Sequence, residues 1–158
     1  MVIVFFIFII TLILLLYSKE THIDSFTNDE NLLNYFTNKE LIKFNKYKKY
    51  YKTIKIPQGQ VTICPSKYIE EIPQITWDGY FINNLVVYPK YRKKTYGSLL
   101  LKKIMKLAKN EGKLHLISQV KSQNIPALNL HKKMGFFVYF KGLNEDNEDV
   151  NVMVYYVK

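Results

Sequence analysis

Apolar and polar residues alternate in several short segments of the chain, which is the pattern of half-buried β-strands. Residues 53–56 and 60–64 both alternate in this way, and the Pro-Gln-Gly step at residues 57–59 suits a turn between them. Residues 80–88 (YFINNLVVY) form a longer apolar run that ends before Pro89. The pattern therefore predicts a hairpin followed by a third strand.

Helical periodicity replaces this alternation after a basic loop, from residue 97 to residue 109. The expected inner face consists of Leu100, Leu101, Ile104, Met105, Leu107 and Ala108, and the outer face of Lys102, Lys103, Lys106 and Lys109. Glu111-Gly112 ends this helix, and residues 114–120 supply a further strand. A strand–loop–helix–strand unit is normally right-handed with parallel strands. The free N–H groups and positive dipole end of its first helical turn suit a phosphate.

The remaining segments are less regular. Residues 32–50 carry apolar side chains at loosely helical spacing, which indicates one or two short helices. Pro65 and Pro73 break the stretch before the third strand. At the other end, the acidic residues 144–149 (NEDNED) read as the turn of a terminal hairpin whose last strand is residues 150–157.

The N-terminus is apolar on every side. Residues 2–16 read VIVFFIFIITLILLL, with Thr11 as the one polar side chain, and a helix of that length is somewhat short of the roughly 30 Å hydrocarbon core of a bilayer. A cleaved signal peptide is disfavoured because no Lys or Arg precedes the run and no small-x-small site follows it. A buried helix would need a larger protein around it. We expect an uncleaved transmembrane anchor at residues 1–17, a juxtamembrane linker at 18–31 and one domain at 32–158.

Composition narrows the class of protein further. The chain has 158 residues, enough for one domain, and a single cysteine, Cys64, which excludes an intramolecular disulfide. With only three histidines besides, we expect no structural metal. The net charge of +10 is spread in short lysine runs, which favours a solvated basic surface over a nucleic-acid interface. Such a surface would still attract phosphates.

Two sequence motifs follow one another in the second half of the chain. The glycine patterns of a P-loop and of a dinucleotide fold are absent. Residues 82–100 (INNLVVYPKYRKKTYGSLL) instead resemble the acetyl-CoA motif of the GCN5-related N-acetyltransferase (GNAT) family, a strand ending in valine followed by [RQ]-x-x-G-x-[GA]. Residues 124–136 (NIPALNLHKKMGF) resemble the second signature of that family, N-x-x-A-x-x-L-Y-x-K-x-G-F. The pair occurs in the expected order and covers about residues 80–140.

This resemblance implies a fold and a set of contacts. It implies an α/β (α+β) fold, with a mixed, mostly antiparallel sheet, a splayed parallel strand pair and helices on both faces. Acetyl-CoA would lie in the splay, with its pantetheine arm along one strand and its pyrophosphate on the loop amides. The residues that the resemblance assigns to the cofactor are Leu85, Val86, Val87, Arg92, Lys93, Lys94, Thr95, Tyr96, Gly97, Ser98 and Asn124.

Two positions depart from the family pattern. Thr95 replaces the usual first loop glycine, so either the loop bends differently, or phosphate binding is weaker, or the hydroxyl donates to a phosphate. His131 replaces the tyrosine that is the family's usual general acid. An unperturbed histidine is about one quarter protonated at pH 7, which makes His131 a candidate acid, while an ordinary packed histidine is the alternative. Residues 81–84 (FINN) carry no carboxylate, so no general base is assigned.

The sequence thus predicts a membrane-anchored N-acetyltransferase that uses acetyl-CoA and an amine acceptor. Because acetyl-CoA is cytosolic, the catalytic domain is expected to face the cytosol. A degenerate relative that binds CoA or a protein partner without catalysis is the alternative, and a tethered nucleic-acid binder is supported by net charge alone. The identity of the acceptor and the oligomeric state have no signature in the sequence.

Overall fold

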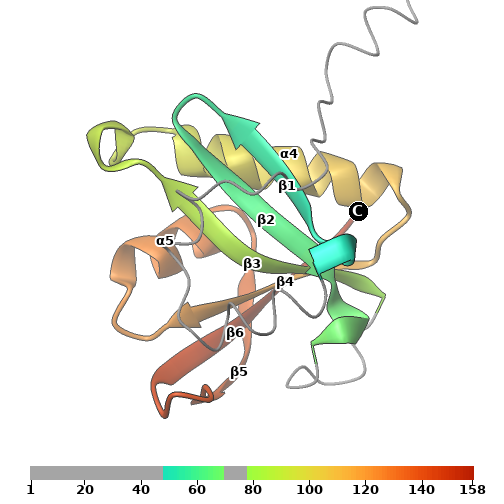
Figure 1. The fold of residues 1–158 in the computed structure, drawn as a ribbon. Coiled ribbons are helices and arrows are strands. Elements are labelled where there is room, and N and C mark those ends of the chain that lie inside the picture. The colour runs from blue at the N-terminus through green and yellow to red at the C-terminus, as the bar shows by residue number, and fades with distance from the viewer. Residues whose placement is uncertain (1–47, 70–77) are drawn as a thin grey trace, which may run out of the picture.

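The computed structural model describes residues 48–69 and 78–158, which form a six-stranded sheet with two α-helices (Figure 1). The strand order is β1-β2-β3-β4-β6-β5, and every neighbouring pair is antiparallel except β3 and β4. The strands are β1 (Lys52–Ile56), β2 (Gly59–Pro65), β3 (Gly79–Val87), β4 (His115–Lys121), β5 (Phe137–Leu143) and β6 (Asp149–Tyr156). The α-helices are α4 (Tyr96–Asn110) and α5 (Ile125–Lys133), and the short 3-10 helices are η1 (Lys48–Tyr50), η2 (Ser66–Tyr68) and η4 (Pro89–Tyr91).

The expected fold class is confirmed, since one parallel pair lies in a mostly antiparallel sheet. The predicted hairpin is β1–β2, in which Ile56 pairs with Gly59. The predicted acidic turn lies between β5 and β6, which pair from Phe137 with Val154 to Leu143 with Asp149. Each of these strands was readable because its alternation is local to the strand.

Helix α4 covers one face of the sheet and lies behind β1 and β2 in Figure 1. Its fully buried side chains Leu100, Leu101 and Ile104 pack against Val61 of β2 and Leu116 of β4. All four outer lysines of the helix are exposed, as its amphipathic pattern predicts. Two residues of the expected inner face, Met105 and Leu107, are half-buried at its flanks.

Helix α5 packs on the same face, where Leu128 and Leu130 join the core that α4 covers. The opposite face carries a second cluster, made of Tyr51, Cys64, Phe81, Ile117, Val152 and Val154. Cys64 is fully buried there, and burial raises the pKa of its thiol to about 12. It is therefore a core residue, as its place in a strand suggested.

The predicted anchor (1–17), the linker (18–31) and most of the helical segment at residues 32–50 lie outside the described residues. The expectation of helices on both faces of the sheet depends on that segment. Within residues 48–69 and 78–158, none of the helices has the length and apolar character needed to cross a bilayer.

Candidate active site

The parallel strands β3 and β4 pair over only part of their length. Their register runs from Gly79 opposite His115 to Ile82 opposite Ser118. Strand β3 then continues to Val87 and β4 to Lys121 without further pairing between them. In Figure 1 the carboxyl ends of the two strands lie apart, with α5 on that side. The facing strand edges therefore offer backbone donors and acceptors to an extended ligand, as in β-strand addition.

A β-bulge accounts for the point at which the strands part. The pairing of β2 with β3 shifts between Thr62, opposite Asn84, and Ile63, opposite Ile82. Asn83 is thus the extra residue, and it directly follows the last β3–β4 pair. A bulge bends its strand and increases its local twist, which turns the end of β3 away from β4. The side-chain Nδ2 of Asn83 is buried without a hydrogen-bond partner among the described residues.

The loop after β3 presents a row of backbone donors. In the described part of the chain, no hydrogen bond occupies the backbone N–H groups of residues 93–98, which lead into the first turn of α4. Thr95 is the N-cap residue, and its side chain makes no capping bond. Successive free N–H groups at a helix N-terminus form a concavity that suits a phosphate. Arg92, Lys93 and Lys94 are exposed around it and add positive charge.

The backbone strain expected at Thr95 is absent. Thr95 has a φ of −84°, in the right-handed region, and the left-handed residue of the loop is Lys93, with a φ of 59°. The loop therefore bends differently from the expected pattern, and threonine fits its position without strain. Arg92 has a further role, because its Nε donates to the carbonyl oxygen of Val87 at 3.1 Å and braces the end of β3.

Close packing of α4 on α5 brings the two sequence motifs together. Gly97, in the first turn of α4, is buried, and a Cβ atom there would lie 2.8 Å from Cδ2 of Leu130. Asn124 caps α5 by accepting a hydrogen bond from the backbone N–H of Ala127 at 3.2 Å. Its side-chain carbonyl oxygen is thus engaged within the helix, and Asn124 is otherwise exposed.

His131 is buried at the C-terminal end of α5, with 3% of its surface exposed. Its Nδ1 lies 2.8 Å from the carbonyl oxygen of Ala127, and its ring lies edge-on to Phe136 with centroids 5.0 Å apart. Because a carbonyl only accepts, Nδ1 carries the proton and Nε2 is the bare nitrogen. Nε2 is buried without a hydrogen-bond partner in the described residues.

The helix end fixes the place of this ring. Phe136 N–H donates to the carbonyl of His131 and Gly135 N–H to that of Lys132, each at 3.0 Å. Gly135 has a φ of 89°, so this is a Schellman motif with the predicted C-cap glycine, and the His131–Phe136 contact is its usual apolar partner. These bonds fix the backbone of His131, and the contacts with Ala127 and Phe136 hold its ring.

The protonation expected for His131 needs correction. Burial lowers the pKa of its imidazole below the ordinary 6.5, although the hydrogen bond to Ala127 acts in the opposite direction. Less than the expected quarter is therefore protonated at pH 7. A role as the acid requires the minor imidazolium form, in which Nε2 would carry the transferable proton.

The described residues offer no carboxylate base on β3. Asp78 is largely exposed and pairs with Lys113 at 3.4 Å, and Glu70 and Glu71 lie outside the described residues. Nor does any group of three or more histidine, cysteine, aspartate or glutamate side chains within residues 48–69 and 78–158 form a metal site.

The bulge at Asn83 was missed from sequence. Two consecutive asparagines inside an apolar strand were its one local signal, because asparagine is depleted in regular strands. The unpaired strand edges, the free loop amides and the surrounding basic side chains together fit the arm and phosphates of acetyl-CoA.

Comparison with known proteins supports this assignment. Residues 70–136 match a family model described as the acetyltransferase (GNAT) family. A search of curated proteins gives no match. Among solved structures, an acetyltransferase of the GNAT family from Streptococcus pneumoniae has a TM-score of 0.56 at 22% identity, covering 78% of this chain and 78% of that one.

Two further solved structures share the fold. The ribosomal-protein-S18-alanine N-acetyltransferase from Escherichia coli has a TM-score of 0.54 at 18% identity, over 70% of this chain and 71% of the other. Arabidopsis thaliana NAA60, in complex with acetyl-CoA, has a TM-score of 0.51 at 24% identity, over 63% and 65%. At these identities the likeness establishes the fold, and together with the family model it supports a GNAT acetyltransferase.

Proposed function

We propose that this chain is an N-acetyltransferase that moves the acetyl group of acetyl-CoA to a primary amine, with its domain held at a membrane by residues 2–16. The observation that carries the proposal is the parting of β3 and β4 after Ile82 and Ser118, beside a loop of free backbone amides. A strand pair that was closed along its length would leave no room for the cofactor. The apolar N-terminal run supports the anchor, and the cytosolic supply of acetyl-CoA supports a domain facing the cytosol.

The geometry of this site supports each proposed contact. The unpaired edge of β3 at residues 85–87 binds the pantetheine arm through its backbone groups. The amides of residues 93–98 hold the pyrophosphate, and Arg92, Lys93 and Lys94 supply positive charge. Asn124 contacts the cofactor through its side-chain NH2 group, which takes no part in capping the helix.

Acetyl-CoA supplies an acyl thioester, and the protein orients an amine against it. Backbone N–H groups near the bulge at Asn83 stabilise the charge that develops on the thioester oxygen. His131 is the proposed acid for the leaving thiolate, acting through Nε2 in its imidazolium form while Nδ1 stays bonded to Ala127. A water molecule or a partly neutral amine replaces a side-chain base.

One observation favours a second function. Burial lowers the pKa of His131 and keeps most of it neutral, so the proposed acid is only weakly populated. A module that binds CoA without turnover is therefore the alternative, and the same experiment separates the two.

The test uses the full chain in detergent micelles. Acetyl-CoA is titrated calorimetrically, and free CoA is then measured with a thiol reagent in the presence of short peptides, lysine and small primary amines. Cys64 is the one cysteine of the chain and is fully buried, so the folded protein adds little background. Binding with amine-dependent CoA release supports the enzyme, binding without release supports the module, and absence of binding overturns both.

Replacement of His131 by Phe tests the acid. We expect kcat to fall about tenfold to a hundredfold near pH 6, where the imidazolium form of the wild type is most populated. His115→Phe is the matched control, because His115 lies at the closed end of the strand pair, against Tyr156. An unchanged rate for His131→Phe from pH 6 to 9 would remove His131 from the mechanism.

A further inference from the structure

The outward side of α4 carries a strip of exposed lysines, which we call the lysine face. Its members are Lys102, Lys103, Lys106 and Lys109. The helix contains no aspartate or glutamate, although a solvated helix face usually mixes both signs of charge three or four residues apart. In the part of the chain that the structure describes, no acidic side chain pairs with Lys102, Lys103 or Lys109. The lysine face therefore offers its charge to a partner outside the domain.

The acidic side chains closest to α4 along the chain and the sheet are bound by other lysines. Glu111, which follows the last residue of the helix, accepts from Lys52 of β1 at 2.7 Å. Asp78, which precedes β3, pairs with Lys113 at 3.4 Å. Neither carboxylate thus neutralises the lysine face.

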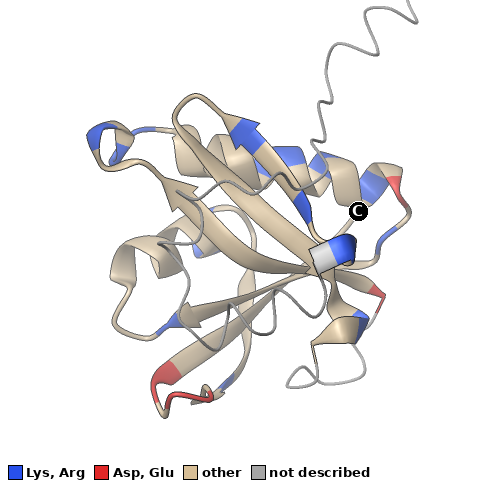
Figure 2. Cartoon of the chain, in the orientation of Figure 1, with Lys and Arg blue, Asp and Glu red and all other residues tan. Residues whose placement is uncertain are grey.

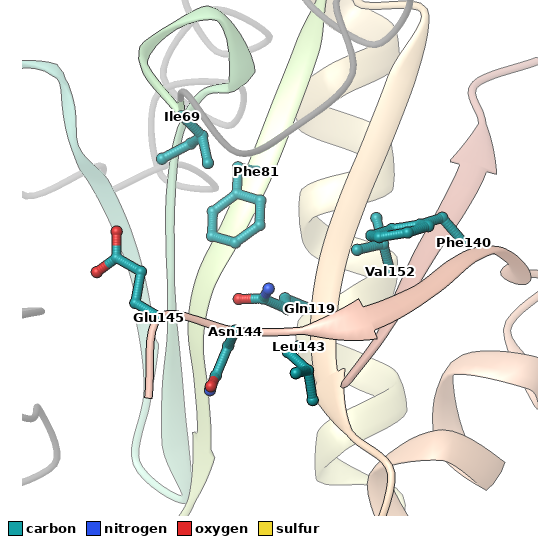
Figure 3. A pocket seen from close by; sticks show the side chains of 8 residues that line it. All are labelled: Ile69, Phe81, Gln119, Phe140, Leu143, Asn144, Glu145 and Val152. Atoms are coloured by element: carbon teal, nitrogen blue, oxygen red, sulfur yellow. The ribbon is translucent and has the colours of Figure 1, made fainter. Parts of the chain in front are cut away.

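Positive and negative charge lie on different parts of the molecule. Figure 2 shows basic residues over α4, β1 and the loop after β3, whereas the β5–β6 turn, at the other end of the view, is acidic. Two residues of that turn, Asn144 and Glu145, line a small hollow on the sheet face opposite α4, together with Phe81 and Val152 (Figure 3). An anionic surface therefore attracts the side of the domain that α4 covers and repels the turn.

A lipid leaflet and a nucleic acid both offer phosphates, and the chain itself favours the leaflet. Residues 18–47 join the proposed anchor to the described domain, and even fully extended they would span only about 100 Å. An anchored domain is therefore held at a high local concentration of lipid headgroups. Leu99, one helical turn before Lys102 and Lys103, is 41% exposed and adds an apolar side chain that suits the headgroup boundary.

We propose that the lysine face of α4 docks on an anionic membrane surface and orients the domain, with the β5–β6 turn pointing away from the leaflet. This inference rests on the anchor in the proposed function and leaves the chemical step unchanged. Near an anionic leaflet each lysine strengthens the attraction about fivefold, so three lysines favour the docked orientation by roughly a hundredfold. The sheet face opposite α4 is then open to the aqueous side, and acceptors reach the domain from solution.

The experiment places the full chain in lipid nanodiscs that carry a nitroxide quencher on their headgroups. Asn110→Cys puts a fluorescent label at the end of the lysine face, and Lys141→Cys puts it on β5, while Cys64 is fully buried and stays unlabelled. Discs of phosphatidylcholine with about one third phosphatidylserine should quench the label at residue 110 at least about twofold more than discs of phosphatidylcholine alone. The label at residue 141 should respond equally to both discs. Addition of about 0.5 M NaCl should remove the difference at residue 110, because salt screens the attraction.

Matched variants separate the lysine face from the total charge of the chain. One variant replaces three lysines of the face, and a control replaces three exposed lysines elsewhere. The variant is Lys102→Gln, Lys103→Gln and Lys109→Gln. The control is Lys67→Gln, Lys132→Gln and Lys141→Gln. The variant should lose the extra quenching at residue 110, the control should keep most of it, and the Kd of the variant for acetyl-CoA should stay unchanged.

Four results would overturn the proposal. Equal quenching at residue 110 in neutral and anionic discs, or equal losses in the variant and the control, overturns it and leaves the proposed function standing. Stronger quenching at residue 141 than at residue 110 overturns the orientation. Loss of the quenching on addition of duplex DNA at an equal phosphate concentration assigns the lysine face to a nucleic acid instead. Failure of the chain to enter either disc overturns the anchor together with this inference, and the calorimetric titration with acetyl-CoA still decides the acetyltransferase.

Discussion

Gly59 opens β2 at the place where this strand meets the end of β3, opposite Val87. A Cβ atom at Gly59 would lie 2.2 Å from the carbonyl oxygen of Val86 and 3.0 Å from Cα of Val87. Both are backbone atoms, so no side-chain rotation relieves the clash in a Gly59→Ala variant. To restore an ordinary contact of at least 3.4 Å, the end of β3 must move by about 1 Å, because packed interiors hold no spare volume.

That movement acts on groups that hold β3 in position. Tyr88 N–H donates to the carbonyl of Gln58 at 3.0 Å, and Arg92 Nε donates to Val87 at 3.1 Å. Overpacking with loss of such contacts costs about 2 kcal/mol in the free energy of unfolding. Because the same residues form the proposed edge for the pantetheine arm, the Kd for acetyl-CoA should rise about tenfold, which corresponds to ~1.4 kcal/mol.

Two measurements on one sample test this prediction. Urea unfolding followed by circular dichroism gives the free energy of unfolding, and calorimetric titration gives the Kd for acetyl-CoA. Gly112→Ala is the control, because nothing lies within 4 Å of its Cβ position and its φ of 65° costs alanine about 1 kcal/mol. The control should lose stability and keep its Kd. If Gly59→Ala also keeps the wild-type Kd, the end of β3 does not form the cofactor site.

Three further variants test individual features. Lys93→Gly should raise the free energy of unfolding in urea by up to about 1 kcal/mol, because Lys93 is the left-handed residue of the loop. Thr95→Gly should not raise it, because Thr95 is right-handed. The reverse result would place the backbone strain at Thr95. Burial lowers the pKa of His131 in the folded chain. Below about pH 6.5 the unfolded chain therefore binds a proton at His131 more readily than the folded chain does. The free energy of unfolding should fall as the pH falls through that range. His131→Phe should flatten this fall, and an identical pH dependence in both proteins would contradict the assigned neutral imidazole. Ile104→Ala should lower the free energy of unfolding by about 3 kcal/mol, because this side chain of α4 is fully buried. Lys103→Ala, on the exposed face of the same helix, should lower it by less than about 0.5 kcal/mol. Similar losses in the two variants would mean that α4 does not pack as described.

The regular elements of the described domain follow from local patterns in the sequence. The alternation in β1 and β2 and the amphipathic pattern of α4 are properties of neighbouring residues, so they were readable without knowing what packs against them. The C-cap at Gly135 was readable for the same reason. The two motifs further indicated the splayed strand pair through a family resemblance. The roles given to Asn124 and His131 stay predictions.

The way in which these elements shape the site depends on tertiary contacts. The bulge at Asn83 depends on the register between β2 and β3, and the left-handed residue at Lys93 depends on where β3 must end and α4 begin. The protonation of His131 depends on its burial against Phe136 and on its hydrogen bond to Ala127. A hollow on the face opposite α4 is lined by side chains from β3, β4, β5, β6 and the β5–β6 turn, which lie far apart along the chain. Strand register, desolvation and cavity shape all arise from contacts between distant segments, and local periodicity does not encode such contacts.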